Sequence, residues 1–105
     1  MSYQNTTIVG FAGSNVEVRE TKSGKQVANV SVAVNEKIGD KETTTWFKVT
    51  FWNGLTKAAQ HINKGQLVLV EGRISTEIWS NENGTPQVTM VVTADKFRFL
   101  GSKPE

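Results

Sequence analysis

Two tryptophans flank a lysine in the segment that offers the clearest binding chemistry. From Thr43 to Trp52 the chain reads TTTWFKVTFW, and successive side chains of a strand point to opposite faces of a sheet. Trp46, Lys48 and Trp52 therefore share one face with the threonine hydroxyls, and the apolar residues between them form a core face. Aromatic faces interleaved with positive charge stack bases and neutralise phosphates. Packing under a loop or in a subunit contact is the alternative for either tryptophan.

A second predicted strand, from Gln66 to Trp79, repeats this arrangement. Arg73 and Trp79 share its polar face, so two strands each present a cation and an aromatic side chain. Glu71 and Glu77 lie on the same face and would repel phosphate. The predicted surface is therefore not uniformly positive, and Trp79 has the alternative role of covering a hairpin.

Four more cations are possible phosphate contacts because they fall in predicted turns: Lys22, Lys25, Lys37 and Lys41. Lys22 and Lys25 flank the turn signal at Ser23-Gly24. The other two lie in a polar segment, from Glu36 to Glu42, that we predict to be a hairpin tip. Solvated charge is the usual state of lysines in such places.

Residues for catalysis or metal binding are few. The chain has no cysteine, and its single histidine, His61, does not make a zinc site alone; we expect it on an exposed helix face. Asp40 and Asp95, the two aspartates, fall in different elements. The acids, serines and histidine form no recognisable acid–base or nucleophile arrangement. We therefore expect no enzyme activity, no metal and no cofactor.

Length and composition indicate one domain over residues 1–105. A chain of this size buries enough surface to fold without disulfides or metal. The formal net charge of +2 is weak evidence for a polyanionic partner, so any attraction depends on where the charges are placed. No apolar run approaches the roughly 20 residues of a membrane span, and the first residues lack the features of a signal peptide. We expect a cytoplasmic protein with no membrane partner.

The elements that position these side chains follow from hydrophobic periodicity. Alternation predicts strands at 6–12, 16–19, 26–35, 43–52, 66–79 and 87–100. Ala33 is assigned to an outward face, and Ile78 and Val88 to the apolar faces of the last two strands. Gly72 marks a bend.

One short helix is predicted after Trp52, where the period changes. The apolar residues Leu55, Ala58, Ala59 and Ile62 have helical spacing. Asn53 is the predicted N-cap, and Lys64-Gly65 supplies the stop. Five main strands with a helix between the third and fourth are the order of the oligonucleotide-binding (OB) fold. We therefore predict an all-β, five-stranded OB-fold barrel over about residues 6–101, with residues 102–105 as a frayed end.

Short motifs occur in a fixed order along nearly the whole chain. They include IVGFAG from Ile8, VANVSVAVN from Val27, TWFKVTFW from Thr45, VEGRI from Val70 and FLG from Phe99. With them the chain resembles the bacterial-type single-stranded DNA-binding proteins of replication. The resemblance spans about Thr6 to Gly101.

This resemblance implies a barrel that usually forms a homotetramer and wraps single-stranded DNA without reading its sequence, in replication, recombination and repair. Trp46 and Trp79 match stacking tryptophans of that family, and Trp52 falls where the family carries a stacking phenylalanine. Lys48 and Arg73 match strand positions that face nucleic acid.

The chain departs from that pattern at three places. Ile38 stands where many members have a further stacking tryptophan. Phe47 replaces a frequent histidine associated with subunit contacts, and we expect it at or near a subunit interface. Family members carry a long acidic-tipped tail that recruits replication and repair proteins, whereas this chain stops at Glu105. The resemblance is thus to the barrel without that tail.

Two alternative functions remain open from the sequence. One is a replication-restart adaptor like the tailless primosomal replication protein B. The other is an interaction module whose aromatic strip binds protein, which Glu71 and Glu77 favour slightly. RNA is an alternative ligand.

Overall fold

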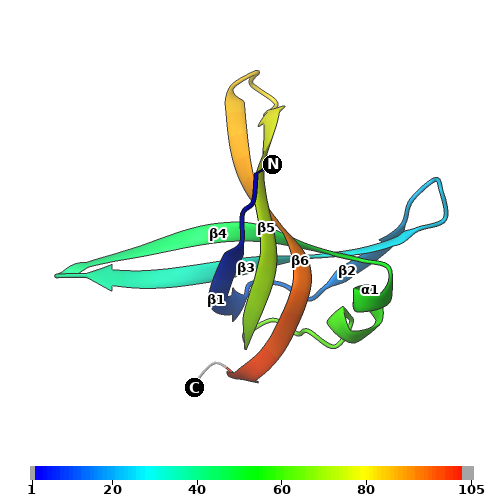
Figure 1. Cartoon of the computed structure of the whole chain (residues 1–105). Helices are drawn as coiled ribbons and strands as arrows, with labels where there is room; N and C mark the ends of the chain where they lie inside the picture. Colours follow the sequence, from blue (N-terminus) through cyan, green and yellow to red (C-terminus); the bar gives the residue numbers. More distant parts are fainter. Residues whose placement is uncertain (1, 103–105) are drawn as a thin grey trace.

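The computed structural model describes residues 2–102, and its strands close into a barrel (Figure 1). The strands are β1 (Thr6–Ala12), β2 (Glu17–Glu20), β3 (Gln26–Ile38), β4 (Lys41–Trp52), β5 (Gln66–Ser80) and β6 (Pro86–Ser102), and a short helix, α1 (Gly54–Ala59), lies between β4 and β5. The sheet order is β1-β5-β6-β4-β3-β2, and β3 also pairs with β1. That last pairing closes five strands into a ring to which β2 is attached. The predicted OB-fold barrel is confirmed.

The barrel core consists of the inward residues that alternation selects. Ile8 of β1 is buried, and the largest fully buried side chains around it include Val32, Val49, Phe51, Val68, Val70 and Val92. Ile62, just after α1, is also fully buried. Burying each such side chain contributes about 1.5–3 kcal/mol. Alternation therefore predicted these core residues correctly.

Two residues assigned to the water-facing side are buried instead. Ala33 lies where β1 pairs with β3, and Phe11 is its Cα partner, so the closing strand covers it. Thr50 of β4 is buried, and its hydroxyl donates to Asn29 Oδ1 at 3.0 Å. A hydroxyl tolerates burial when it has such a partner.

Gly72 allows the bend that the sequence predicted. The ladder between β5 and β6 shifts register between Glu71 and Gly72, which is the irregularity of a β-bulge. A Cβ at Gly72 would collide with the carbonyl oxygen of Thr93 on β6. Only glycine lets the two strands approach this closely.

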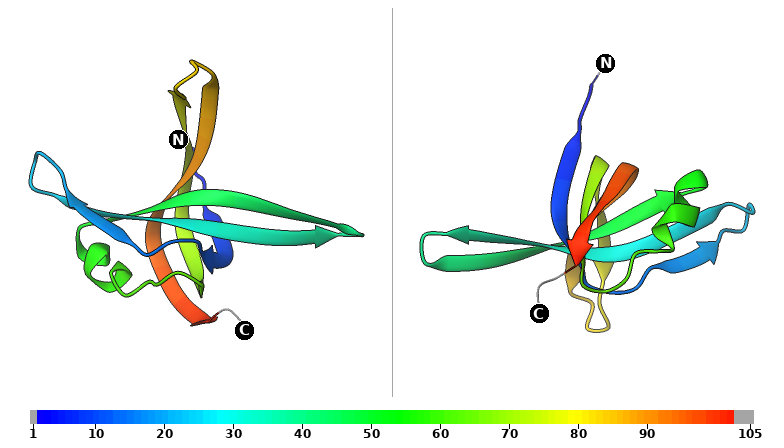
Figure 2. Two further views of the ribbon diagram at one scale, coloured as in Figure 1. Left: turned by 180° about the vertical axis from the view of Figure 1, so that it is seen from behind. Right: turned by 90° about the horizontal axis from the view of Figure 1, so that it is seen from below.

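Three hairpins extend from the barrel in different directions, formed by β2–β3, β3–β4 and β5–β6 (Figure 2). The predicted hairpin tip is present, but its turn is shorter than the predicted segment from Glu36 to Glu42, because the β3–β4 ladder continues to the pair Ile38–Lys41 and leaves only Gly39 and Asp40 in the turn. On the β5–β6 hairpin, Ile78 and Val88 are 77% and 64% exposed. Their assignment to the core is wrong because this part of the hairpin projects beyond the barrel.

The helix is shorter than predicted, and the predicted residue Asn53 occupies its N-cap position. Asn53 has φ 50° and makes no side-chain cap; instead its carbonyl accepts a hydrogen bond from Thr56 Oγ1 at 2.6 Å. Thr56 and Ala59 are the buried helix residues, whereas Ala58 is exposed. No helix among residues 2–102 has the length and apolarity needed to cross a membrane.

The last strand is longer than predicted and runs to Ser102. Most of the predicted frayed end, residues 103–105, lies outside the described residues.

Candidate nucleic-acid interface

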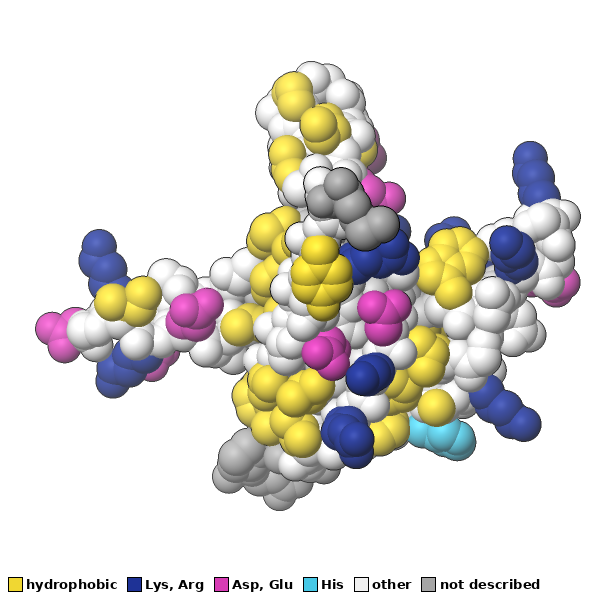
Figure 3. Space-filling model, viewed as in Figure 1, with side chains coloured by type: hydrophobic (Ala, Val, Ile, Leu, Met, Phe, Trp, Pro, Cys, Tyr) yellow, Lys and Arg dark blue, Asp and Glu magenta, His cyan; other side chains and the backbone are white. Residues whose placement is uncertain are grey.

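All three tryptophans are substantially exposed, as their place on the polar strand faces predicted. Trp46 and Trp52 of β4 are 54% and 40% exposed, and Trp79 of β5 is 49% exposed. Tryptophan is normally well buried on average. Figure 3 shows hydrophobic side chains over the barrel and along the β5–β6 hairpin, with lysine and arginine side chains among them. Exposed aromatic surface of this kind indicates a binding face.

Trp52 forms one wall of a hollow of about 310 Å³, the Trp52 hollow, to which β2, β3, β4, β5 and β6 all contribute. Arg19 and Lys48 are its cations, and Glu77 also lines it. The Asn29–Thr50 hydrogen bond lies in its floor. An aromatic wall, two cations and fixed polar groups suit a nucleotide, since the ring can stack a base while a cation pairs with its phosphate.

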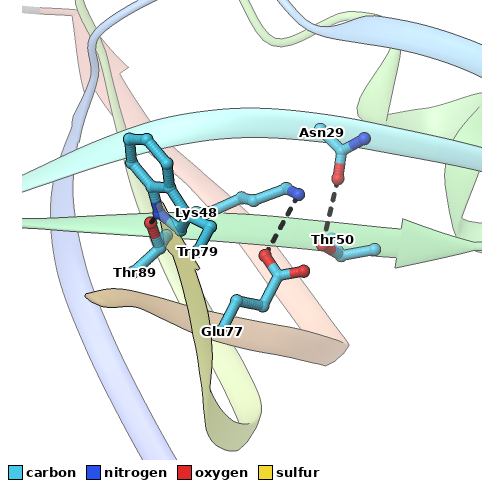
Figure 4. Close-up of polar contacts among 6 residues, drawn as sticks. All are labelled: Asn29, Lys48, Thr50, Glu77, Trp79 and Thr89. Atoms are coloured by element: carbon cyan, nitrogen blue, oxygen red, sulfur yellow. Dashed lines mark hydrogen bonds and ion pairs between the residues drawn. The ribbon is translucent and has the colours of Figure 1, made fainter. Parts of the chain in front are cut away.

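Lys48 does not present a free charge to this hollow. Its Nζ lies 3.3 Å from Glu77 Oε1 in an ion pair that joins β4 to β5 (Figure 4). Both side chains are partly exposed, so the pair stabilises the fold by only about 0.2–1 kcal/mol. The sequence placed both residues on polar strand faces, and the structure brings them together.

Trp79 continues this surface onto the projecting hairpin. Its indole Nε1 donates to Thr89 Oγ1 of β6 at 2.9 Å, which orients the ring (Figure 4). Glu77 and Trp79 are two residues apart on β5 and therefore share a face. That face is the one that reaches Lys48 on β4.

Trp46 lies in a separate hollow of about 480 Å³, with Phe11, Gly13, Thr44 and Lys64 among its lining residues. A Cβ on Gly13 would collide with the Trp46 ring, so the glycine lets the ring lie against the backbone there. Trp46 and Trp52 thus share a strand face but do not surround Lys48 in one site. Strand twist over six residues turns them toward different parts of the surface.

Arg73 also lies outside the Trp52 hollow. It lines a hollow of about 630 Å³ together with Tyr3 and Asp95. The two hollows adjoin, because Thr93 lines the Trp52 hollow and is the Cα partner of Arg73 across β5 and β6.

The four turn lysines remain exposed and line neither tryptophan hollow. Lys22 and Lys25 are at the end of the β2–β3 hairpin, and Lys37 and Lys41 are near the end of the β3–β4 hairpin. Lys37 lies opposite Glu42, which offsets its charge. Their role as phosphate contacts stays a prediction.

Two cations in these hollows were missed from the sequence, Arg19 and Lys64. Arg19 is in a four-residue strand that is exposed throughout, so no apolar partner marked its faces. Lys64 was interpreted only as part of the helix stop. Pairing of β2 with β3 brings Arg19 beside Val27, which lines the Trp52 hollow.

Phe47 is half-buried and packs against the barrel core. Its place at a subunit interface remains a prediction. His61 is exposed in the turn that follows α1. Among residues 2–102, no three histidine, aspartate or glutamate side chains gather as a metal site would require.

The family described as "Single-strand binding protein family" has a model that matches residues 3–100. A single-stranded DNA-binding protein of Chlamydia caviae is 37% identical over 92 residues, which are 87% of this chain and 57% of the relative. A Chlamydia muridarum protein of the same name is 34% identical and covers 93% of this chain and 64% of its own length. Single-stranded DNA-binding protein 1 of Synechocystis is 33% identical over 98% of this chain and 88% of the relative. The chain therefore spans only about 57–64% of the length of the chlamydial proteins.

A solved structure of the Plasmodium falciparum SSB in complex with ssDNA superposes with a TM-score of 0.78. The match covers 95% of this chain and 96% of that chain at 24% sequence identity. It establishes a common fold.

Proposed function

The chain belongs to the single-strand binding protein family, and we propose that it binds single-stranded DNA without reading the base sequence. The family is not one of enzymes. One observation carries the proposal: three half-exposed tryptophans on the outer faces of β4 and β5, with cations in the hollows that Trp46 and Trp52 line. The solved relative whose fold this chain shares was captured with single-stranded DNA.

Binding combines base stacking with phosphate neutralisation. Each base stacked on Trp46, Trp52 or Trp79 contributes about 1–3 kcal/mol, and every base offers a flat face to an indole. Arg19 and Lys48 take phosphate charge in the Trp52 hollow and release counterions. Sequence preference is slight because neither contribution reads a base edge.

Glu77 neutralises part of the positive charge that the interface offers to DNA. Lys48 exchanges its Glu77 partner for a phosphate when DNA binds, or keeps it and places a carboxylate near the phosphate. Either route lowers the affinity that Lys48 adds. Glu77 on the β5 face therefore competes with the DNA phosphates for Lys48.

A fluorescence titration with oligothymidylate tests the proposal. Bases stacked on Trp52 quench indole emission, and Trp52→Ala weakens binding by about 1–3 kcal/mol. The matched control is Val18→Ala, which shortens an apolar side chain of nearly the same exposure (39% against 40% for Trp52) that lines neither tryptophan hollow, and it leaves binding unchanged. A folded wild-type protein that neither binds nor is quenched at low salt favours instead the protein-interaction alternative. Oligouridylate in the same titration tests RNA.

We propose that the chain assembles as a homotetramer. Ile78 and Val88 support this, because they are Cα partners and place two exposed apolar side chains side by side on one hairpin face. Exposed apolar patches mark interfaces. Phe47 is the second proposed contact. Sedimentation tests both: Ile78→Lys or Phe47→Lys dissociates the tetramer, and a wild-type monomer at tens of micromolar rules it out.

The biological setting is also proposed. A protein that coats single strands acts in replication, recombination and repair, and we propose that this one does so in the cytoplasm. Partner replication and repair proteins join through an acidic tail if the full-length protein carries one. The adaptor alternative predicts association with primosomal proteins and the same DNA chemistry.

A further inference from the structure

The residues before β1 are held against β5 by one side chain. Gln4 Nε2 donates to the Ile74 carbonyl at 2.9 Å, and Gln4 Oε1 accepts the Ile74 backbone N–H at 2.9 Å. These are the two bonds that a residue of a neighbouring strand makes in a ladder. Asn5 Nδ2 adds a bond to Glu71 Oε1 at 3.2 Å. The segment that precedes β1 is therefore held alongside β5.

Tyr3 is the most exposed aromatic side chain in the described part of the chain. It is the chain's single tyrosine, it is 88% exposed, and it immediately precedes Gln4. Leaving a large ring in water costs hydrophobic free energy that burial would recover. The bonds of the neighbouring Gln4 hold this part of the chain against β5, and the exposed Tyr3 ring is available to a ligand.

Arg73 provides a cation to the same hollow of about 630 Å³ that Tyr3 lines. The ion pair found among residues 2–102 joins Lys48 to Glu77, so Arg73 has no carboxylate within 4 Å in that range. Asp95 lines the same hollow and opposes a phosphate, but it also forms no ion pair with Arg73. A guanidinium and an exposed phenol ring in one hollow are the pair of groups that one nucleotide needs.

This hollow continues the surface described above. Arg73 and Thr93 face each other across the β5–β6 ladder, and Thr93 lines the Trp52 hollow. A DNA strand that leaves the Trp52 hollow on the side of Thr93 would therefore reach Arg73.

We propose that Tyr3 and Arg73 form a further nucleotide subsite for single-stranded DNA, with a base on the Tyr3 ring and its phosphate on Arg73. This inference rests on the proposed function and lengthens the path of the bound strand beyond Trp52. Gln4 is a positioning residue that holds Tyr3 in place. The subsite is filled only when the oligonucleotide is long enough to pass the Trp52 hollow.

Oligonucleotide length tests the subsite. Binding of oligothymidylates of about 5 and about 15 nucleotides is measured by anisotropy of a labelled strand, within the range of site sizes known for such barrels. Tyr3→Ala weakens the long strand about five-fold or more and leaves the short strand unchanged. Tyr3→Phe keeps the ring face and binds like wild type, whereas Tyr3→Leu behaves like the alanine variant.

Three outcomes overturn the subsite. They are equal affinity of Tyr3→Ala and wild type for the long strand, equal loss on both strands, and failure of Tyr3→Phe to restore binding. Absence of binding by the wild-type protein overturns the proposed function instead, so the two failures are distinguishable. Tyr3 is outside the core, and circular dichroism checks that each variant is folded.

Photo-cross-linking gives a second readout that does not depend on affinity. A long oligothymidylate with 5-iodouracil substitutions forms an adduct on the peptide containing Tyr3, and Gln4→Ala reduces its yield. In a Tyr3→Ala background, Gln4→Ala causes no additional loss of affinity. An adduct that avoids this peptide, or an additional loss, contradicts the arrangement.

Discussion

Replacing Glu77 by glutamine should strengthen single-stranded DNA binding. Lys48 Nζ is 3.3 Å from the Glu77 carboxylate, and a phosphate oxygen bound to the far side of the ammonium group lies about 2.8 Å from it. The two negative charges are then about 6 Å apart, and Coulomb's law in water gives about 0.7 kcal/mol of repulsion. If Lys48 leaves Glu77 instead, the loss of a surface ion pair costs about 0.2–1 kcal/mol.

Both routes predict the same change. Glu77→Gln removes the competitor and tightens binding of oligothymidylate about three-fold at low salt. It also frees a full charge at Lys48, so the slope of log affinity against log salt becomes steeper by up to about 0.7. Tryptophan fluorescence titrations at several salt concentrations measure both quantities.

Glu82→Gln is the matched control because it changes the net charge equally. Glu82 is in the loop of the same β5–β6 hairpin and does not line the Trp52 hollow. If the two variants have the same affinity and the same salt slope, only net charge matters. The ion pair would then have no part in binding, and the reasoning from its geometry would be refuted.

Three other changes test the remaining parts of the structure. Gly13→Val displaces the Trp46 ring, so it should weaken oligothymidylate binding nearly as much as Trp46→Ala does, by about 1–3 kcal/mol. The slope of log affinity against log salt should change little. Unchanged affinity in a folded variant would show that Gly13 has no part in the binding site. Trp79→Phe keeps the stacking face and loses only the bond to Thr89, so anisotropy should show a smaller loss of affinity than Trp79→Ala gives. Phe51→Ala empties the middle of the barrel and should lower the free energy of unfolding in urea by about 3–5 kcal/mol, and a loss below 1 kcal/mol would mean that the core collapses around the gap.

Strand alternation predicted the fold where one face of each strand meets the core. The buried valines of β3, β4 and β5 follow that rule because the closed ring is narrow and fills with their side chains. The rule failed for Ile78 because alternation identifies a face of a strand and not the depth at which the strand leaves the barrel. Asn53 takes the predicted N-cap position, but its side chain forms no cap, since a residue with φ 50° does not have the backbone geometry of an ordinary N-cap.

The exposure of single site residues could be predicted from the sequence, but which of them lie close together could not. Exposure of the tryptophans follows from alternation within one strand. The Lys48–Glu77 ion pair depends on how β4 and β5 lie relative to each other, and β6 stands between them in the sheet. Tyr3 precedes the first periodic segment, so no pattern marked it. Its position depends on the hydrogen bond between its neighbour Gln4 and Ile74, which lies 70 residues further along the chain.

The projecting β5–β6 hairpin has a consequence for how the length of this chain can change. Trp79 and Ile78 are consecutive residues, so one hairpin face carries the aromatic ring and the other the apolar pair with Val88. Inserting one residue at the base of β5 would exchange these faces along the whole projecting part, because the side-chain period of a strand is two. Insertions into either strand of the hairpin should therefore be tolerated only when they add an even number of residues. The loop from Asn81 to Thr85 lies beyond both faces, so residues inserted there leave the two surfaces on their own sides of the hairpin as long as the β5–β6 register is kept.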